Sequence, residues 1–281
     1  MQNYLDLLRE IDANGIEKEN RTGVKTKSVF GKSLEFDLAH GFPVVTTKKI
    51  HLKSVIHELL WFISGNTNIR YLQENGVRIW NEWADEEGNL GPIYGHMWRK
   101  WPCSDGTTID QLGKAIETLK TDPDDRRIIV NAWNPEYLPI KGKSFSENVH
   151  LGKQALPPCH YSFQFVSYDN NGIRDLNLLW NQRSVDCFLG LPFNITSYAL
   201  LLAMVAQVVK MRPRKLVFHG GDCHLYENHL EQVRKQIQRK PYPLPDLRLN
   251  PAIDNIDDFS YNDIEIVNYR HHSMLSGRVA V

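Results

Sequence analysis

The chain lacks closely spaced cysteines. Its four cysteines, Cys103, Cys159, Cys187 and Cys223, lie far apart, and none belongs to a Cys-x-x-Cys pair. This spacing argues against a structural zinc site, whose ligands usually come in close pairs, and against a disulfide framework. No apolar signal segment opens the sequence. We therefore expect a cytoplasmic protein that needs neither disulfides nor a metal.

The chain also lacks a net charge, because 33 Lys and Arg balance 33 Asp and Glu. It therefore has no overall basic character of the kind that attracts nucleic acid or an anionic membrane, and any anion site must be formed locally. Long apolar runs are missing too. The longest, within residues 195–209, is interrupted by polar residues and is shorter than the roughly 20 residues of a membrane span. It predicts a buried central helix instead.

No repeat, low-complexity tract or Pro/Ser-rich linker divides the 281 residues. Patterns of both secondary-structure types alternate throughout, which predicts a single α+β domain over residues 1–281. Residues 139–153 are rich in Lys, Ser, Gly and Asn and predict a surface loop. We expect helices at 4–13, 52–63, 111–120 and 230–239, strands at 28–30, 34–36, 44–47, 128–133 and 215–219, and a Gly-rich turn at 220–226.

Residues 159–184 predict a β-hairpin that carries a reactive cysteine. Apolar and polar residues alternate at 160–165 and 176–180, as in half-buried strands, and an Asp-Asn-Asn-Gly turn separates them. If Tyr168 pairs with Ile173, Cys159 lies opposite Gln182 and beside Arg183. An adjacent cation favours the thiolate over the thiol. Cys159 is therefore a candidate nucleophile, although a buried, inert cysteine is the alternative.

Three arginine motifs predict an anion site. Arg21 precedes Thr-Gly, Arg126 and Arg127 precede a predicted strand, and Arg183 lies beside the thiol. Guanidinium forks match phosphate oxygens bidentately, so four of them suit a dianion. The alternative is that Arg126 and Arg127 only balance the aspartates at 122, 124 and 125.

Two further polar residues occupy unusual positions. Glu58 lies among apolar neighbours in the predicted helix 52–63, where it is either a buried general acid or base or an exposed salt-bridge partner. Asn194 lies at the start of the apolar helix. Its amide either caps that helix or pairs with the N–H and C=O of a nucleobase edge.

Histidine and aromatic residues complete the candidates. His224 and Tyr226 are two residues apart, so both would point the same way and hydrogen-bond a sugar, although lone histidines are more often structural. Trp80 and Trp83 either stack on a flat cofactor or fill the core.

Ten motifs, taken in order, resemble the folate-dependent thymidylate synthase family across essentially the whole chain. They are Arg21-Thr22-Gly23, His57-Glu58-Leu59-Leu60-Trp61, Ile79-Trp80, Gly91-Pro92-Ile93-Tyr94-Gly95, Arg126-Arg127, Pro158-Cys159-His160, Gln182-Arg183-Ser184, Asp186, Phe188-Leu189-Gly190-Leu191-Pro192-Phe193-Asn194 and Gly221-Asp222-x-His224-x-Tyr226. The resemblance implies a large mixed or antiparallel sheet, helices around the central buried helix, and a homodimer that packs sheet against sheet.

The same resemblance implies the chemistry. Cys159 would add to C6 of dUMP, and 5,10-methylenetetrahydrofolate would supply the one-carbon unit and the hydride, giving dTMP and dihydrofolate. The implied catalytic residues are Cys159, Glu58, Tyr94, Asn194, Asp186 and Arg183. The implied dUMP-binding residues are Arg21, His160, Gln182, Arg183, Ser184, Asp186, Asn194, His224 and Tyr226, with Arg126 and Arg127 of the partner subunit. The implied folate-binding residues are His51, Ile79, Trp80, Trp83, Asp186, Leu189, Gly190, Phe193 and Ala280, closed over by a C-terminal lid at 277–281.

Three alternatives stay open. A dUMP hydroxymethylase shares the cysteine attack and the folate but adds water in place of hydride. A homologue without turnover would bind a nucleotide or RNA, although zero net charge argues against it. A cysteine hydrolase is weakened because no Asn or Asp stands out to orient His160.

Overall fold

The computed structural model describes residues 1–20 and 22–278, in which helices and strands alternate. The helices are α1 (Gln2–Asn14), α2 (Leu52–Ile63), α3 (Arg70–Glu74), α4 (Tyr94–Arg99), α5 (Gln111–Thr121), α6 (Phe145–His150), α7 (Gly190–Val208) and α8 (Leu230–Ile237). The strands are β1 (Ile16–Lys18), β2 (Thr26–Asp37), β3 (Trp101–Pro102), β4 (Thr108–Ile109), β5 (Ile129–Asn131), β6 (His160–Asn170), β7 (Ile173–Asp186), β8 (Arg212–Tyr226), β9 (Asp246–Leu249) and β10 (Ile264–Val267).

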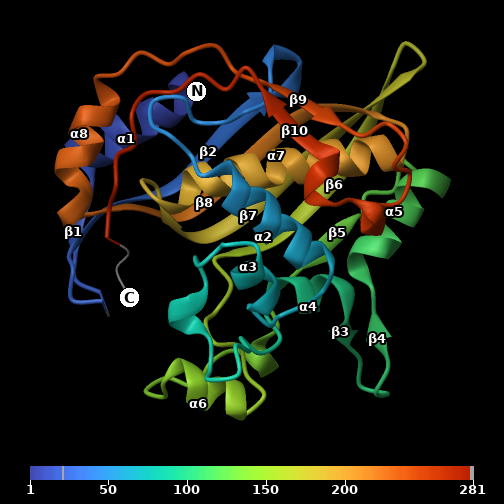
Figure 1. Ribbon diagram of the computed structural model, residues 1–281, viewed down its shortest axis with the longest axis horizontal. Helices are drawn as coiled ribbons and strands as arrows, with labels where there is room; N and C mark the ends of the chain where they lie inside the picture. The colour runs from blue at the N-terminus through green and yellow to red at the C-terminus, as the bar shows by residue number, and fades with distance from the viewer. Residues whose placement is uncertain (21, 279–281) are drawn as a thin grey trace.

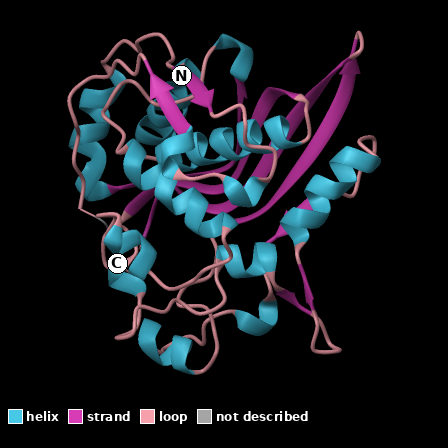
Figure 2. Ribbon diagram, turned by 45° about the vertical axis from the view of Figure 1, so that its right-hand side comes forward, coloured by secondary structure: helices cyan, strands magenta, loops and turns pink. Residues whose placement is uncertain are grey.

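One mixed sheet organises the molecule (Figure 2). Its strand order is β1-β2-β8-β7-β6-β5. The central pair β7 and β8 is parallel, and the other pairs in this sheet are antiparallel. Two small sheets, β3-β4 and β9-β10, lie outside it. The predicted α+β domain with a mixed sheet is confirmed.

Helix α7 forms the centre of the fold (Figure 1). It packs on β7 and β8, and α2 covers it from the other side. It is the one helix within 1–20 and 22–278 that is long and apolar enough to cross a membrane, yet 83% of its apolar window is buried inside the protein. A helix that is apolar all round must be enclosed by other elements. The predicted buried central helix is therefore confirmed.

The two faces of the sheet differ in burial. On β7, Leu176, Leu178 and Trp180 point toward the core and are buried, whereas the alternating residues Asn177 and Leu179 are only partly covered. Exposed apolar side chains occur elsewhere in the sheet, with Ile129 at 50% and Tyr168 at 64%. An antiparallel or mixed sheet can leave one face to solvent or to a partner.

One expected strand and one expected turn are wrong. Residues 44–47 are buried but belong to no strand. There the Tyr269 hydroxyl donates to the Val45 carbonyl at 2.8 Å, so a side chain binds a backbone group that a strand partner would otherwise bind. Residues 220–226, expected as a turn, continue β8 to Tyr226. An apolar run indicates burial and need not form a strand, which explains the error at 44–47. Glycines in a strand can mark close packing and need not form a turn, which explains the error at 220–226.

The segment 139–153 is not an irregular loop, because it contains α6. Ser144 accepts from the N–H of Glu147, and Glu147 accepts from the N–H of Ser144, a capping box. Asn148 is buried and its Nδ2 donates to the Ser144 carbonyl at 2.9 Å. The Ser-x-x-Glu signal was present in the sequence, but the surrounding Lys and Gly obscured it.

The hairpin of β6 and β7 forms as predicted with a different register. Asn170 pairs with Ile173, and the turn between them has positive φ at Asn171 (58°) and Gly172 (83°), as a two-residue turn requires. Tyr168 therefore pairs with Asp175, two residues from the predicted partner. An irregularity between His160 and Ser162 shifts the register back by one, so His160 lies opposite Gln182.

Candidate functional site

A cavity of about 410 Å³ lies where β7 and β8 end beside Cys159. Six of the predicted dUMP-site and catalytic residues line it, together with Trp83 from the predicted folate set. They are Cys159, Arg183, Ser184, Asp186, His224 and Tyr226. The parallel pairing of Ser184 with Asp222 and of Asp186 with His224 brings the two strands' polar residues to one place.

Arg183 lies against the Cys159 segment, as predicted. Its backbone N–H donates to the Cys159 carbonyl at 2.9 Å. Its guanidinium donates from Nε to the Pro158 carbonyl at 2.9 Å and from Nη2 to the Pro157 carbonyl at 3.0 Å. Only two of the five guanidinium N–H groups are used in these bonds. Arg183 therefore shapes the Pro-Pro-Cys segment and keeps donors for an anion in the cavity.

Tyr94 and His160 form the support behind Cys159. The Cys159 backbone N–H donates to the Tyr94 hydroxyl at 2.9 Å, and the Tyr94 ring stacks on His160 with centroids 4.2 Å apart. His160 Nδ1 lies 2.8 Å from the Tyr198 hydroxyl. Burial lowers the pKa of His160 to about 3. The imidazole is thus neutral and a poor general base near pH 7, which weakens the cysteine hydrolase alternative.

Glu58 is buried and is not an exposed salt-bridge partner. Trp80, 8% exposed, donates from Nε1 to Glu58 Oε1 at 2.7 Å. Burial raises the pKa of Glu58 to about 7, and the bond from Trp80 partly opposes this rise. A carboxyl with this pKa gains and loses a proton near neutral pH. Trp80 is a core residue that also orients this carboxyl.

Asn194 does not cap α7, so the capping interpretation is wrong. The helix begins at Gly190, which places Asn194 inside it. Asp186 instead accepts from the N–H groups of Phe188 and Leu189, both at 2.9 Å, just before the helix starts. The Asn194 Oδ1 accepts from Gln182 Nε2 at 3.1 Å.

His224 and Tyr226 lie side by side on β8, with ring centroids 5.2 Å apart. His224 Nδ1 is 3.2 Å from Asp222 Oδ1. This contact, followed by bonds from Lys18 and Ser28, holds the pKa of Asp222 well below its usual range. Asp222 is therefore a fixed negative charge at the cavity wall, and it orients the histidine.

The predicted folate residues are only partly brought together. Trp83 lines the cavity, and Leu189 and Phe193 are partly buried at the start of α7, where Gly190 is its first residue. His51 is exposed and accepts from the Ser54 N–H at the start of α2, and Ile79 is 37% exposed. Neither lines the cavity. Ala280 and the rest of the predicted lid beyond Arg278 lie outside the described residues.

Of the other predicted arginines, Arg126 and Arg127 lie within the described residues and do not line the cavity. Arg127 is exposed and binds Asp125 through Nε and Nη2, each at 2.9 Å. Arg126 is exposed too. Within one chain the charge-balance interpretation therefore holds for Arg127. Arg21 lies outside the described residues.

Two features escaped the sequence analysis. Lys48 is buried, donates to the Phe188 carbonyl and lies 3.7 Å from the centre of the Phe188 ring. Burial lowers its pKa to about 7, and only the Lys-Lys pair before α2 marks it in the sequence.

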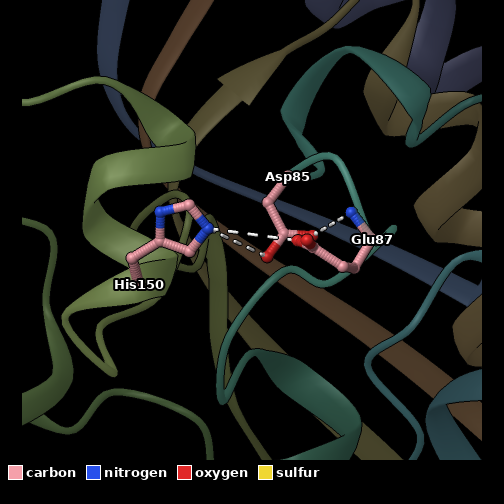
Figure 3. Close-up of side chains that lie close together, drawn as sticks. All are labelled: Asp85, Glu87 and His150. Atoms are coloured by element: carbon pink, nitrogen blue, oxygen red, sulfur yellow. Dashed lines mark hydrogen bonds and ion pairs between the residues drawn. The ribbon is translucent and has the colours of Figure 1, made fainter.

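Asp85, Glu87 and His150 form a cluster whose polar atoms lie within 4.8 Å of one another (Figure 3). Asp85 Oδ1 already accepts two backbone N–H groups, so the cluster chiefly joins α6 to the 85–87 turn.

The comparison with known families agrees with this geometry. The family model described as thymidylate synthase matches residues 2–281. The chain belongs to the thymidylate synthase family. Members of this family transfer a one-carbon unit to dUMP and use methylenetetrahydrofolate. The predicted family membership is confirmed over the whole chain.

Proposed function

We propose that this protein converts dUMP to dTMP by reductive methylation, with 5,10-methylenetetrahydrofolate as carbon donor and reductant. The observation that carries the proposal is the set of residues around one cavity: Cys159 as nucleophile, Arg183 as anion binder, and His224 and Tyr226 as hydrogen-bond partners. Covalent catalysis on a nucleoside monophosphate needs a nucleophile for the base, a cation for the phosphate and hydrogen-bond partners for the sugar in one place. The cavity volume of about 410 Å³ is in the range of small-molecule sites.

The Cys159 sulfur forms a bond to C6 of the pyrimidine, and the C5–C6 π electrons move toward C5 and O4. This step turns an unreactive C5 into a nucleophile. The Tyr94 hydroxyl binds the Cys159 N–H, so Tyr94 holds the attacking residue in place. We propose that the same hydroxyl, with ordered water, helps to remove the C5 proton. Once the carbon unit on C5 has been reduced, the C5–C6 double bond would re-form and the S–C6 bond would break, so that Cys159 leaves as a thiolate and dTMP is released.

Glu58 handles protons in this scheme, because its pKa of about 7 lets it donate and accept near neutral pH. Asn194 pairs with the uracil edge, and Ser184 adds a hydrogen bond to the phosphate. Trp83, Asp186 and the start of α7 are the described residues that would hold the folate, which supplies the carbon unit and the hydride when bound. A C-terminal lid would exclude water before hydride transfer.

We further propose that the active form is a homodimer. The face of the sheet that points away from α7 is only partly covered and carries Ile129 and Tyr168, which fits a second copy packed against it. Arg126 and Arg127 are exposed in the chain and would reach the phosphate site of the partner subunit. A cytoplasmic location stays a prediction from the sequence.

The decisive experiment supplies dUMP and methylenetetrahydrofolate, follows dihydrofolate by absorbance and determines the product mass. The proposal expects dTMP and dihydrofolate in equal amounts. Hydroxymethyl-dUMP without dihydrofolate would identify a hydroxymethylase. Binding of dUMP without any product would identify a homologue without turnover.

A further inference from the structure

We propose that Trp180 is a positioning residue that sets the direction of the Asn194 amide and thereby favours uracil over cytosine. This inference rests on the proposed function, in which Asn194 pairs with the base edge. Trp180 is 0% exposed and does not line the cavity, so it acts through other residues.

A chain of hydrogen bonds leads from Trp180 to the site. Trp180 Nε1–H donates to Gln182 Oε1 at 3.2 Å. Gln182 Nε2 then donates to Asn194 Oδ1 at 3.1 Å and to the Ser184 carbonyl at 3.3 Å. Ser184 belongs to the cavity wall. The hydrogen-bond chain therefore runs from the buried core to Asn194 and to the backbone of Ser184 at the cavity wall.

The hydrogen-bond partners on both sides of the Gln182 amide determine which way this amide faces. The two ends of an amide have similar shapes, so Gln182 alone could face either way. An indole N–H can only donate, which requires the Gln182 oxygen on its side. The Ser184 carbonyl can only accept, which requires the Gln182 NH₂ on the other side. Asn194 must then turn its oxygen toward Gln182, and its NH₂ group is left for a ligand.

This amide direction suits uracil. Uracil presents an acceptor at O4 beside the N3–H donor, whereas cytosine presents an amino donor beside an acceptor at N3. An amide whose NH₂ faces position 4 of the base donates to uracil O4 and meets the cytosine amine donor to donor. A site built for one hydrogen-bond pattern rejects the ligand that leaves its polar groups unsatisfied.

Trp180 is well placed to hold this direction. Its ring stacks on Tyr198, with centroids 5.0 Å apart and an interplanar angle of 12°. The Phe218 ring also lies near the indole, with centroids 5.1 Å apart and an interplanar angle of 46°. A buried, stacked indole cannot swing its N–H away from Gln182. Trp180→Phe keeps an aromatic ring and removes only the donor and part of the volume.

The experiment measures the dissociation constants of dUMP and dCMP by calorimetry without folate. Trp180→Phe should reduce the preference for dUMP by about fivefold or more, the effect of one lost hydrogen bond. Phe218→Leu is the packing control, because it disturbs the same stack and leaves the donor chain intact. It should keep the dUMP preference of the unmodified protein within about twofold, as expected for a change of packing alone.

Gln182→Met provides a second test, because it removes the middle member of the hydrogen-bond chain. This variant keeps the inference testable if Trp180→Phe does not fold. Gln182→Met should lower the preference for dUMP over dCMP. The double variant Trp180→Phe/Gln182→Met should lower it no further than Gln182→Met alone. An unchanged preference in either folded variant, an equal change in Phe218→Leu, or equal binding of both nucleotides by the unmodified protein overturns the inference. Binding without folate is independent of the product, so a protein that prefers dUMP but makes no dTMP contradicts only the proposed function.

Discussion

The strand-borne and the peripheral parts of the predicted site differ in how completely one chain assembles them. Cys159, Arg183, Asp186 and His224 surround one cavity at the ends of β6, β7 and β8. Arg126 and Arg127 are exposed, and Arg127 binds a neighbouring aspartate. Strand pairing positions Arg183, Asp186 and His224, which lie on β7 and β8. Cys159 directly precedes β6, and its carbonyl accepts the Arg183 N–H. No contact within the described chain draws the second group to the cavity.

This contrast indicates a division of labour. In the proposed function, the cavity of one chain supplies the nucleophile and the groups that bind the sugar, and Arg126 and Arg127 of the partner subunit complete the phosphate site. Buried and exposed groups also differ in energetics. Burial strongly shifts the pKa of Glu58, whereas the ion pair of an exposed arginine contributes little to stability. The four predictions below test the division, from the largest expected effect to the smallest.

Replacement of the proposed nucleophile, Cys159, should have the largest effect. Cys159→Ser should lower dTMP formation by at least about a thousandfold, because a hydroxyl is a far weaker nucleophile than a thiolate. Binding of dUMP should persist, measured by calorimetry. Cys103→Ser, in the β3-β4 region, is the control and should keep full activity. A fully active Cys159→Ser protein would remove the nucleophile from the proposal.

Loss of a peripheral arginine should be repaired by a partner subunit. Arg126→Ala should raise KM for dUMP by about tenfold or more, because a charged hydrogen bond to phosphate is lost. At a dUMP concentration well below KM, where Arg126→Ala alone keeps about a tenth of the rate, an equal mixture with Cys159→Ser chains should reach about a quarter of full activity, since half of the dimers are mixed and each has one complete site. Arg174→Ala, which breaks an ion pair with Asp124, is the control. No recovery after subunit exchange would place Arg126 in its own chain's site.

The buried carboxyl of Glu58 should make the free energy of unfolding depend on pH. Its pKa rises from 4.5 to about 7 on folding, so the native state keeps a proton that the unfolded chain loses in this range. The free energy of unfolding should therefore fall as pH rises from 4.5 to 7, by up to about 3 kcal/mol.

Glu58→Gln should flatten that dependence in urea titrations and also lower kcat. The exposed Glu265→Gln should change neither quantity. A pH dependence of stability that is identical in Glu58→Gln and the unmodified protein would show that Glu58 has an ordinary pKa.

The smallest effect is expected far from the cavity, in α6. Ser144→Ala removes the capping box and should destabilise this helix by about 1 kcal/mol. Hydrogen exchange of residues 145–150 should accelerate while kcat stays unchanged. Ser104→Ala, in the β3-β4 turn, should leave that exchange as it is. Equal exchange in both variants would mean that α6 is held by its packing and not by its cap.

Much of the site could be predicted because its motifs are local. Period-2 alternation and the Asn-Gly turn marked the hairpin, and this placed Cys159 beside Arg183 despite a two-residue error in register. The error arose because alternation defines the face of a strand and not the length of the turn. The strand predicted at 44–47 failed for a related reason, since an apolar run indicates burial without naming a partner.

The sequence by itself determined the family, the α+β class and the buried central helix, and it supplied the candidate reactive residues, because each depends on residue types at short spacing. Only the tertiary structure decided which of those residues meet. It brought Glu58 to Trp80, made His160 a neutral support, placed Asn194 inside α7 and not at its N-cap, and linked Trp180 to Asn194 through Gln182. Such contacts join residues that are distant along the chain, and their geometry depends on how helices and strands pack.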